Sequence, residues 1–306
     1  MRFLLLAILL VPLSAQAVRM GPGPIITPES SPSIGSNING PSLLRVPAWV
    51  AKPLGKYYLY FAHHGGKFIR LAYANDLQGP WTVHEPGVLQ LNNVPACRDH
   101  IASPDVHVDQ DQRQIRMYFH CPAAQLNADM RNQKTLVSFS TDGLNFAAKS
   151  ELLGPSYFRV FRWRGDYYAI ARGGVFLRSK DGVSKFDEGP TPFPRDPLLR
   201  HAAVDLVGDS LSVYYSRIGD SPESILLSKI RLTPDWMEWK TSPPVTLISP
   251  ATDAEGASLP SQPSKSDAAP GRVRQLRDPA FFREEGKTYL LYSIAGESGI
   301  SIAALK

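Results

Sequence analysis

The stretch that decides the fold reads Arg277-Asp278-Pro279-Ala280-Phe281-Phe282, then Glu285-Gly286, then Thr288-Tyr289-Leu290-Leu291-Tyr292. Two short runs rich in aromatic and branched residues with a turn between them are typical of a β-hairpin. A third apolar run follows at 299–303. This unit therefore predicts three successive antiparallel strands.

The same unit recurs four times upstream. Its hairpins are expected at 40–46 with 57–61, 103–108 with 115–119, 154–160 with 167–170, and 201–206 with 211–215. Third strands are expected at 68–73, 135–139, 175–178 and 224–230. Five copies of one hairpin favour an all-β, five-bladed β-propeller. A two-sheet sandwich, which also has many short strands, is the alternative.

The two ends of the chain bear on ring closure and on localisation. Met1-Arg2, an apolar run at 3–13 and Ser14-Ala15-Gln16-Ala17 predict a secretory signal peptide with cleavage after Ala17. We therefore expect a secreted or periplasmic protein with a single propeller domain at 18–306 and no membrane span. The last unit stops after its third strand, so its fourth strand is expected at 24–27.

The Pro-, Ser- and Ala-rich stretch at 249–271 is interpreted as a loop inserted before the fifth unit.

Composition and the cysteines narrow the class of protein. Apolar residues are 43% and charged residues 20%, which indicates a globular chain. The formal net charge is +5, but Lys and Arg form no basic run, so we expect no nucleic-acid partner. Cys97 and Cys121 flank the second hairpin, which predicts a disulfide in a secreted chain, with two unpaired thiols as the alternative.

One end of the ring should collect the polar side chains, because the entry to each first strand and the exit from each second strand lie at the same end. Six of the seven histidines, all but His84, are expected at or near it. The residues placed at this end are Asn39, His63, His64, Asp99, His100, Asp105, His120, Tyr157, Arg172, His201, Arg217, Asp220, Glu223, Arg277, Asp278 and Glu297.

Two of these positions belong to recognisable motifs. Ser103-Pro104-Asp105-Val106 and Arg277-Asp278-Pro279, together with the five blades and the leader, resemble the five-bladed β-propeller glycoside hydrolases of families 43, 32, 68 and 117. The resemblance implies a secreted, exo-acting enzyme that cleaves a glycosidic bond of a plant or algal oligosaccharide or polysaccharide in a funnel on the ring axis.

The resemblance also implies roles for particular residues. Family 43 members carry a general-base Asp in the first blade, a second Asp that tunes pKa in the second, and a general-acid Glu in the third. Only the second is matched, by Asp105, because the other two places read Asn39-Gly40-Pro41 and Leu153-Gly154-Pro155. Arg277-Asp278-Pro279 is similar to the Arg-Asp-Pro element of family 32.

Acetal hydrolysis needs a proton donor for the leaving oxygen and a carboxylate that activates water or attacks the sugar. The predicted catalytic residues are Asp105, Asp278, His201 and Glu223. The predicted substrate-binding residues are Asn39, His63, His64, His100, Tyr157, Arg217, Arg277 and Glu297. The competing structural interpretations are a turn-forming role for Asp278 and solvated surface positions for Glu223 and Glu297. Glu255, in the insertion, is of interest only if that loop covers the funnel.

Three alternatives stay open. Because two family acids are missing, the chain could be a carbohydrate-binding propeller without catalysis. His63-His64, or His100 with His120, could hold a metal, although no metal-binding spacing is present and we predict no metal and no cofactor. The His and Arg content also leaves lyase or sulfated-glycan chemistry open.

Overall fold

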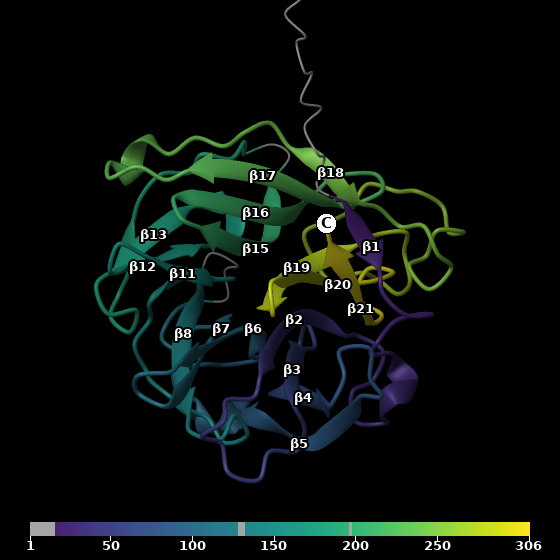
Figure 1. The fold of residues 1–306 in the computed structure, drawn as a ribbon, viewed down its shortest axis with the longest axis horizontal. Coiled ribbons are helices and arrows are strands. Elements are labelled where there is room, and N and C mark those ends of the chain that lie inside the picture. The colour runs from purple at the N-terminus through teal and green to yellow at the C-terminus, as the bar shows by residue number, and fades with distance from the viewer. Residues whose placement is uncertain (1–15, 128–131, 196–197) are drawn as a thin grey trace, which may run out of the picture.

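The computed structural model describes residues 16–127, 132–195 and 198–306, so the predicted signal peptide lies almost wholly outside the described residues. The described residues form five antiparallel sheets arranged as blades around one axis (Figure 1). The prediction of an all-β, five-bladed propeller is confirmed, and the sandwich alternative is wrong. No helix in the described part of the chain is long and apolar enough to cross a membrane.

In each blade the strands follow one another outward from the axis (Figure 1). Blade 1 contains β2 (Asn39–Arg45), β3 (Tyr57–Ala62), β4 (Phe68–Ala74) and β5 (Thr82–Gln90). Blade 2 contains β6 (Ala102–Asp109), β7 (Gln114–Pro122) and β8 (Gln133–Ser140), with β9 (Ala147–Ala148) and β10 (Gly154–Pro155) both paired to β8. Blade 3 contains β11 (Arg159–Trp163), β12 (Asp166–Ile170), β13 (Phe176–Ser179) and β14 (Asp187–Glu188).

Blade 4 contains β15 (Leu199–Val207), β16 (Ser210–Arg217), β17 (Ile225–Arg231) and β18 (Val245–Ile248). Blade 5 contains β19 (Arg277–Glu284), β20 (Lys287–Ser293), β21 (Ile300–Leu305) and β1 (Ala17–Arg19). Short 3₁₀ helices lie at η1 (Pro28–Ser30), η2 (Leu91–Asn93), η4 (Arg172–Gly174) and η5 (Trp236–Glu238).

The ring closes through the N-terminal segment. β1 pairs antiparallel with β21, with Ala17 opposite Leu305. The fourth strand of blade 5 is therefore residues 17–19, and the expectation of residues 24–27 is wrong. That later stretch still touches β21, where Ile26 forms a single bridge with Ile300. β1 covers residues 303–305 of β21, and the Met20 and Ile25 amides continue along the same edge by donating to the carbonyl oxygens of Ile302 and Ile300.

Glu255 holds this closure together from the insertion. Its carboxylate accepts hydrogen bonds from Arg19 at 2.8 Å and from the Tyr292 hydroxyl at 3.0 Å, and it is 2% exposed. Glu255 thus ties the insertion to β1 and β20, which is a structural role outside the ring axis.

Apolar packing between blades stabilises the ring. Each of the five hydrophobic clusters lies between two neighbouring blades, as with Tyr60 of blade 1 and Phe119 of blade 2 in one of them. Each blade therefore buries both faces, and burial of this apolar surface is the main driving force for folding.

Blade 3 begins later than the sequence predicts. Gly154 and Pro155 pair with Thr135 and Lys134 of β8 in blade 2, and the first strand of blade 3 is β11. Tyr157, between them, has a φ of +66°. Gly154 and Pro155 ahead of Tyr157 belong to the sheet of blade 2, so the predicted strand at 154–160 is divided between blades 2 and 3.

Cys97 and Cys121 form the predicted disulfide, with their Cα atoms 5.6 Å apart. The hairpin β6–β7 brings the two cysteines together, because Cys97 precedes β6 and Cys121 lies near the end of β7. The alternative of two unpaired thiols is wrong.

Candidate active site

The innermost strands surround a channel of about 240 Å³ on the ring axis, lined by residues of β2, β6, β11, β15 and β19. Most of these strands start with an irregularity. Register shifts occur at the start of β2, β6, β15 and β19, and Gly40, Ser103, Tyr157 and Asp278 all have positive φ. Bulges redirect side chains next to active sites, so this end of the ring is where a site is expected.

His201 and Asp278 form a buried pair at this end. Nδ1 of His201 contacts Oδ1 of Asp278, and the side chains are 12% and 2% exposed. The other carboxylate oxygen of Asp278 accepts a hydrogen bond from Ser293 Oγ at 3.1 Å. Nδ1 and Nε2 of His201 and Oδ1 of Asp278 are all buried and make no hydrogen bond among the described residues, so Nδ1 and Oδ1 meet only as an ion pair, and Nε2 has no partner of either kind.

This contact fixes the position of the proton on the ring. Burial and the guanidiniums of Arg200 and Arg159 lower the pKa of His201 well below its ordinary value, whereas the adjoining Asp278 carboxylate acts in the opposite direction. In either charge state Nδ1 carries a proton, because it faces a carboxylate oxygen. Nε2 is therefore the atom that can gain or lose a proton.

A row of aromatic rings continues from His201 toward blade 2. The Tyr157 ring lies between His201, at 4.0 Å between ring centroids, and His120, at 4.1 Å. His100 follows, 6.2 Å from His120. Burial lowers the pKa of His120 well below its ordinary value, and that of His100 by less. We call His100, His120, Tyr157 and His201 the histidine cluster.

A buried ion network adjoins this cluster. Arg277 donates to Glu297 at 2.9 Å and to Glu223 at 3.1 Å, and Arg200 donates to the second oxygen of Glu223 at 2.8 Å. Glu223 also accepts from Ser216 Oγ at 2.6 Å. We call Arg200, Glu223, Arg277 and Glu297 the ion network.

Both glutamates are buried, with Glu223 0% and Glu297 4% exposed, so the interpretation of them as solvated surface groups is wrong. Arginine partners offset the cost of removing the two charges from water. Sequence alone could not show this, because both glutamates lie in loop segments.

Glu297 is held as a carboxylate. Burial acts to raise its pKa, but His64, Arg277 and Asn37 together lower it to about 2. Asn37 donates at 2.6 Å and Asn39 at 3.2 Å, and His64 Nδ1 lies 3.5 Å away. A carboxylate with this pKa cannot supply a proton near neutrality. Glu297 is therefore suited to accepting hydrogen bonds and to positioning Arg277.

Asp105 lies in the wall of the axial channel and not in the histidine cluster. Its Oδ2 accepts a hydrogen bond from the Val160 amide at 2.8 Å and lies 2.8 Å from His107 Nε2. A similar contact joins blades 1 and 2, where Ser42 Oγ accepts a hydrogen bond from the Val106 amide at 3.0 Å. Both contacts join the innermost strands of neighbouring blades, so Asp105 has a structural role.

The charge of Asp105 is maintained in this setting. Burial acts to raise its pKa, but His107, Arg159 and the Val160 amide lower it below its ordinary value. His107 lines the channel beside it rather than joining the other histidines, so five histidines and not six lie toward the candidate site. No contact joins Asp105 to Asp278 among the described interactions.

The remaining predicted residues differ in their positions. Arg217 pairs with Asp220 at 2.9 Å and lines a separate groove with Pro192 and Phe193. His63 Nδ1 accepts a hydrogen bond from the Gly65 amide at 2.9 Å, and burial lowers the pKa of His63. Within the described ranges, no group of three or more His, Cys, Asp or Glu side chains could hold a metal ion.

Arg200, Asn37 and Ser293 were not predicted as site residues. Arg200 had a readable signal, because Arg200-His201 stands at the entry to the first strand of blade 4 as Arg277-Asp278 stands in blade 5. Asn37 and Ser293 had none, because their importance depends only on which carboxylates they reach.

Comparison with known proteins places this geometry in a wider context. No protein-family model matches the chain. The uncharacterized protein R118 of Acanthamoeba polyphaga mimivirus is 38% identical over 300 residues, covering 88% of this chain and 83% of R118. The chain belongs to the R118 family.

Several solved structures are similar to this chain in fold. The β-xylosidase/α-arabinofuranosidase CoXyl43 from a compost metagenome, a family 43 glycoside hydrolase, aligns with a TM-score of 0.62 at 14% identity, covering 95% of each chain. The family 43 enzyme of Xanthomonas citri with xylose gives 0.63 at 14%, covering 95% and 91%. An N-acetylgalactosamine deacetylase from F. plautii gives 0.63 at 12%, covering 95% of each. This chain of the R118 family therefore shares the propeller fold of these proteins.

Proposed function

We propose that this protein is a secreted hydrolase that cleaves a glycosidic bond at the end of a glycan chain, with His201 as its acid–base group. The observation that carries the proposal is the buried pair of His201 and Asp278, in which Nδ1 lies against a carboxylate oxygen as an ion pair and Nε2 has neither an ion-pair nor a hydrogen-bond partner among the described residues. A ring whose one nitrogen is oriented by a carboxylate is the arrangement that proton-transfer catalysis uses.

The chemistry assigned to His201 is donation of a proton. Because burial lowers the pKa of His201 well below its ordinary value, the charged ring forms in acid, where Asp278 stabilises it and Nε2–H gives its proton to the leaving glycosidic oxygen. Water then attacks the anomeric carbon as the glycosidic bond breaks, and the neutral Nε2 takes up the proton that the water loses. Glu223 and Glu297 beside the cluster both accept hydrogen bonds, and Glu297 is held ionised. The three donors around Glu223 support His201 rather than Glu223 as the proton donor, with Asp278 as its partner.

Substrate binding is assigned to polar groups beside the dyad. His64 is 32% exposed and lies next to Glu297, and Tyr157 is partly exposed beside His201. Asn39 and Arg277 hold Glu297 as a hydrogen-bond acceptor. Sugar hydroxyls both donate and accept, so an ionised carboxylate, an imidazole and a phenol are suitable partners. We include His63 and His100 in this surface and leave Arg217 outside it.

Localisation rests on the leader and the disulfide. The predicted signal peptide at 1–17 and the Cys97–Cys121 bridge support export of a domain at 18–306. The carbohydrate-active proteins that share the fold support a saccharide substrate.

The test is hydrolysis by the purified domain. It would be incubated with xylo-, arabino-, fructo- and algal galacto-oligosaccharides, in plain and acetylated forms, while new reducing ends and free acetate are measured. We expect new reducing ends from wild type and from His84→Gln, whose histidine lies in β5, the outermost strand of blade 1, and none from His201→Gln. Equal turnover by His201→Gln would refute the assignment.

A second candidate function, removal of an acyl group from a sugar, is favoured by the presence of a single acid–base dyad. Hydrolysis of an acyl group on a sugar can use one histidine, first as base and then as acid. One structural neighbour is an N-acetylgalactosamine deacetylase. Acetate without new reducing ends would indicate this activity. Saccharide binding with neither product would indicate the non-catalytic propeller.

A further inference from the structure

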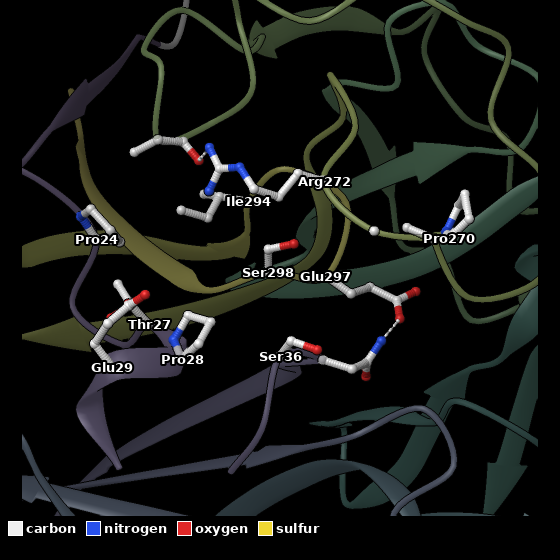
Figure 2. Close-up of a pocket in the computed structure, with 14 residues that line it drawn as sticks. Pro24, Thr27, Pro28, Glu29, Ser36, Pro270, Arg272, Ile294, Glu297 and Ser298 are labelled. Atoms are coloured by element: carbon white, nitrogen blue, oxygen red, sulfur yellow. Dashed lines mark hydrogen bonds between the residues drawn. The ribbon is translucent and has the colours of Figure 1, made fainter. Parts of the chain in front are cut away.

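A cavity of about 560 Å³ opens beside the ion network, away from the ring axis. Its walls come from the segment before β2, from the insertion before β19 and from the turn between β20 and β21. Figure 2 shows Pro24, Thr27 and Pro28 on one side, Pro270 on the other, and Ser298 and Glu297 between them. We call this cavity the outer pocket.

The outer pocket is continuous with the candidate active site through two shared residues. Glu297 and Asn37 both line it, and Glu297 also binds Arg277 of the ion network and lies 3.5 Å from His64. The Asn37–Glu297 hydrogen bond of 2.6 Å is the dashed contact at Glu297 in Figure 2. A ligand in the pocket would therefore touch the same carboxylate that the site holds ionised.

The insertion wall is fixed in place before any ligand arrives. Arg272 donates to the carbonyl oxygens of Asp253 and Ala254, at 2.6 and 3.3 Å. Glu255 ties the same loop to Arg19 and Tyr292. Because these contacts already hold the loop that forms this wall, the loop loses little conformational entropy when a ligand binds.

The lining matches the two kinds of surface that a sugar ring presents. Proline and isoleucine side chains supply apolar walls for its C–H faces: Pro24, Pro28, Pro270 and Ile294. Hydroxyl, amide and charged groups supply partners for its hydroxyls: Thr27, Ser36, Asn37, Ser298, Glu29, Arg272 and Glu297. A volume within about 300–1,000 Å³ and a mixed lining are characteristic of small-molecule sites.

We propose that the outer pocket is a saccharide subsite, which holds a sugar unit attached to the one at His201. This inference rests on the proposed function for the identity of the substrate. The proposal assigns the preference for substrates of a certain chain length to the insertion before β19 and to the N-terminal segment. Neither belongs to the repeated hairpin. Oligosaccharides bind more tightly than the single terminal sugar because only they reach the pocket.

The experiment blocks the pocket chemically. Cys97 and Cys121 are joined, so Ser36→Cys introduces a single thiol at an exposed position in the pocket wall. Pro270→Cys does the same from the opposite wall. Ser150→Cys, exposed in blade 2 and absent from the pocket lining, is the matched control. Each would be compared with and without a bulky maleimide, in a His201→Gln background that prevents turnover.

Binding would be read by saturation-transfer NMR and calorimetry with xylo-, arabino- and galacto-oligosaccharides of three to six units. We expect labelling at 36 and at 270 to weaken oligosaccharide binding at least tenfold and labelling at 150 to leave it within twofold. Unchanged binding after labelling at 36 and 270 would overturn the proposal. So would the absence of binding by any of these saccharides to the unlabelled protein.

The result is separable from the proposed function. Turnover by wild type together with label-insensitive binding leaves the enzymatic proposal standing and removes only the subsite. Label-sensitive binding with no turnover by wild type keeps the subsite and removes the enzyme.

Discussion

Nδ1 of His201 contacts Oδ1 of Asp278 across the boundary between blades 4 and 5, leaving Nε2 buried and unpartnered. Each residue is at or near the start of the innermost strand of its blade. The pair therefore exists only because the innermost strands of blades 4 and 5 lie next to each other at this end of the ring.

Asp278→Asn tests this relationship directly. The amide cannot hold the Nδ1 proton as a carboxylate does, so we expect kcat to fall about 10²–10⁴-fold, the range for loss of general acid–base catalysis. Asp205→Asn, in β15 and paired with Arg283, is the control and should retain activity. Steady-state kinetics on the substrate found in the hydrolysis screen measures both. Wild-type turnover by Asp278→Asn would remove the dyad from the mechanism.

The pH profile distinguishes the two hydrolytic roles of His201. If Nε2–H gives its proton to a glycosidic oxygen, kcat/KM rises as pH falls through the pKa of the ring. If the neutral ring first takes a proton from water, as in deacylation, kcat/KM rises with pH instead. Because burial lowers the pKa of His201 well below its ordinary value, we expect the first profile for glycoside cleavage, with the rise on the acid side of neutrality, measured between about pH 3 and 9. A profile that is flat over that range would contradict both roles.

Asp105 is expected to affect stability more than turnover. Its carboxylate satisfies the buried Val160 amide, and Asp105→Ala leaves that amide without a partner. The expected cost is about 1–3 kcal/mol in the free energy of unfolding, measured by urea denaturation. Asp105→Asn keeps an acceptor oxygen and should lose less. If Asp105→Asn is folded and stable but inactive, Asp105 takes part in the chemistry after all.

Glu297 should make the fold sensitive to acid. Its pKa in the folded chain is about 2, below the ordinary value of 4.5, so its contribution to stability is complete above pH 4.5 and is lost as pH falls toward 2. Glu297→Gln should therefore be less stable than wild type at neutral pH, with a difference in Tm that shrinks below pH 4.5. Glu188→Gln, at an exposed position in β14, should follow the wild-type curve. A pH-independent difference for Glu297→Gln would contradict the ion network.

The disulfide should contribute substantially to stability. The double variant Cys97→Ser with Cys121→Ser is expected to unfold about 2–5 kcal/mol more easily than wild type, because the bridge restricts the unfolded chain. Urea denaturation with and without a reductant measures the effect. Reductant should change the wild-type midpoint and leave that of the double variant where it is. An identical midpoint for the two proteins without reductant would exclude a stabilising bridge.

The sequence by itself determined the repeated hairpins, the blade count and the Cys97–Cys121 pair. These depend on contacts between residues close in the chain, where alternation, turn residues and hairpin geometry are all readable. It failed locally at 154–160, because Gly154 and Pro155 pair with β8 of blade 2 and blade 3 begins only after Tyr157.

Only the tertiary structure decided which polar residues meet. Asp278 reaches His201, Glu223 and Glu297 are buried against Arg277, and Asp105 turns to the Val160 amide of the next blade. The same holds for the fourth strand of blade 5, which the sequence predicts at 24–27 and which is formed by residues 17–19. Such contacts depend on how neighbouring blades are placed around the axis, and no local pattern in the chain encodes that placement.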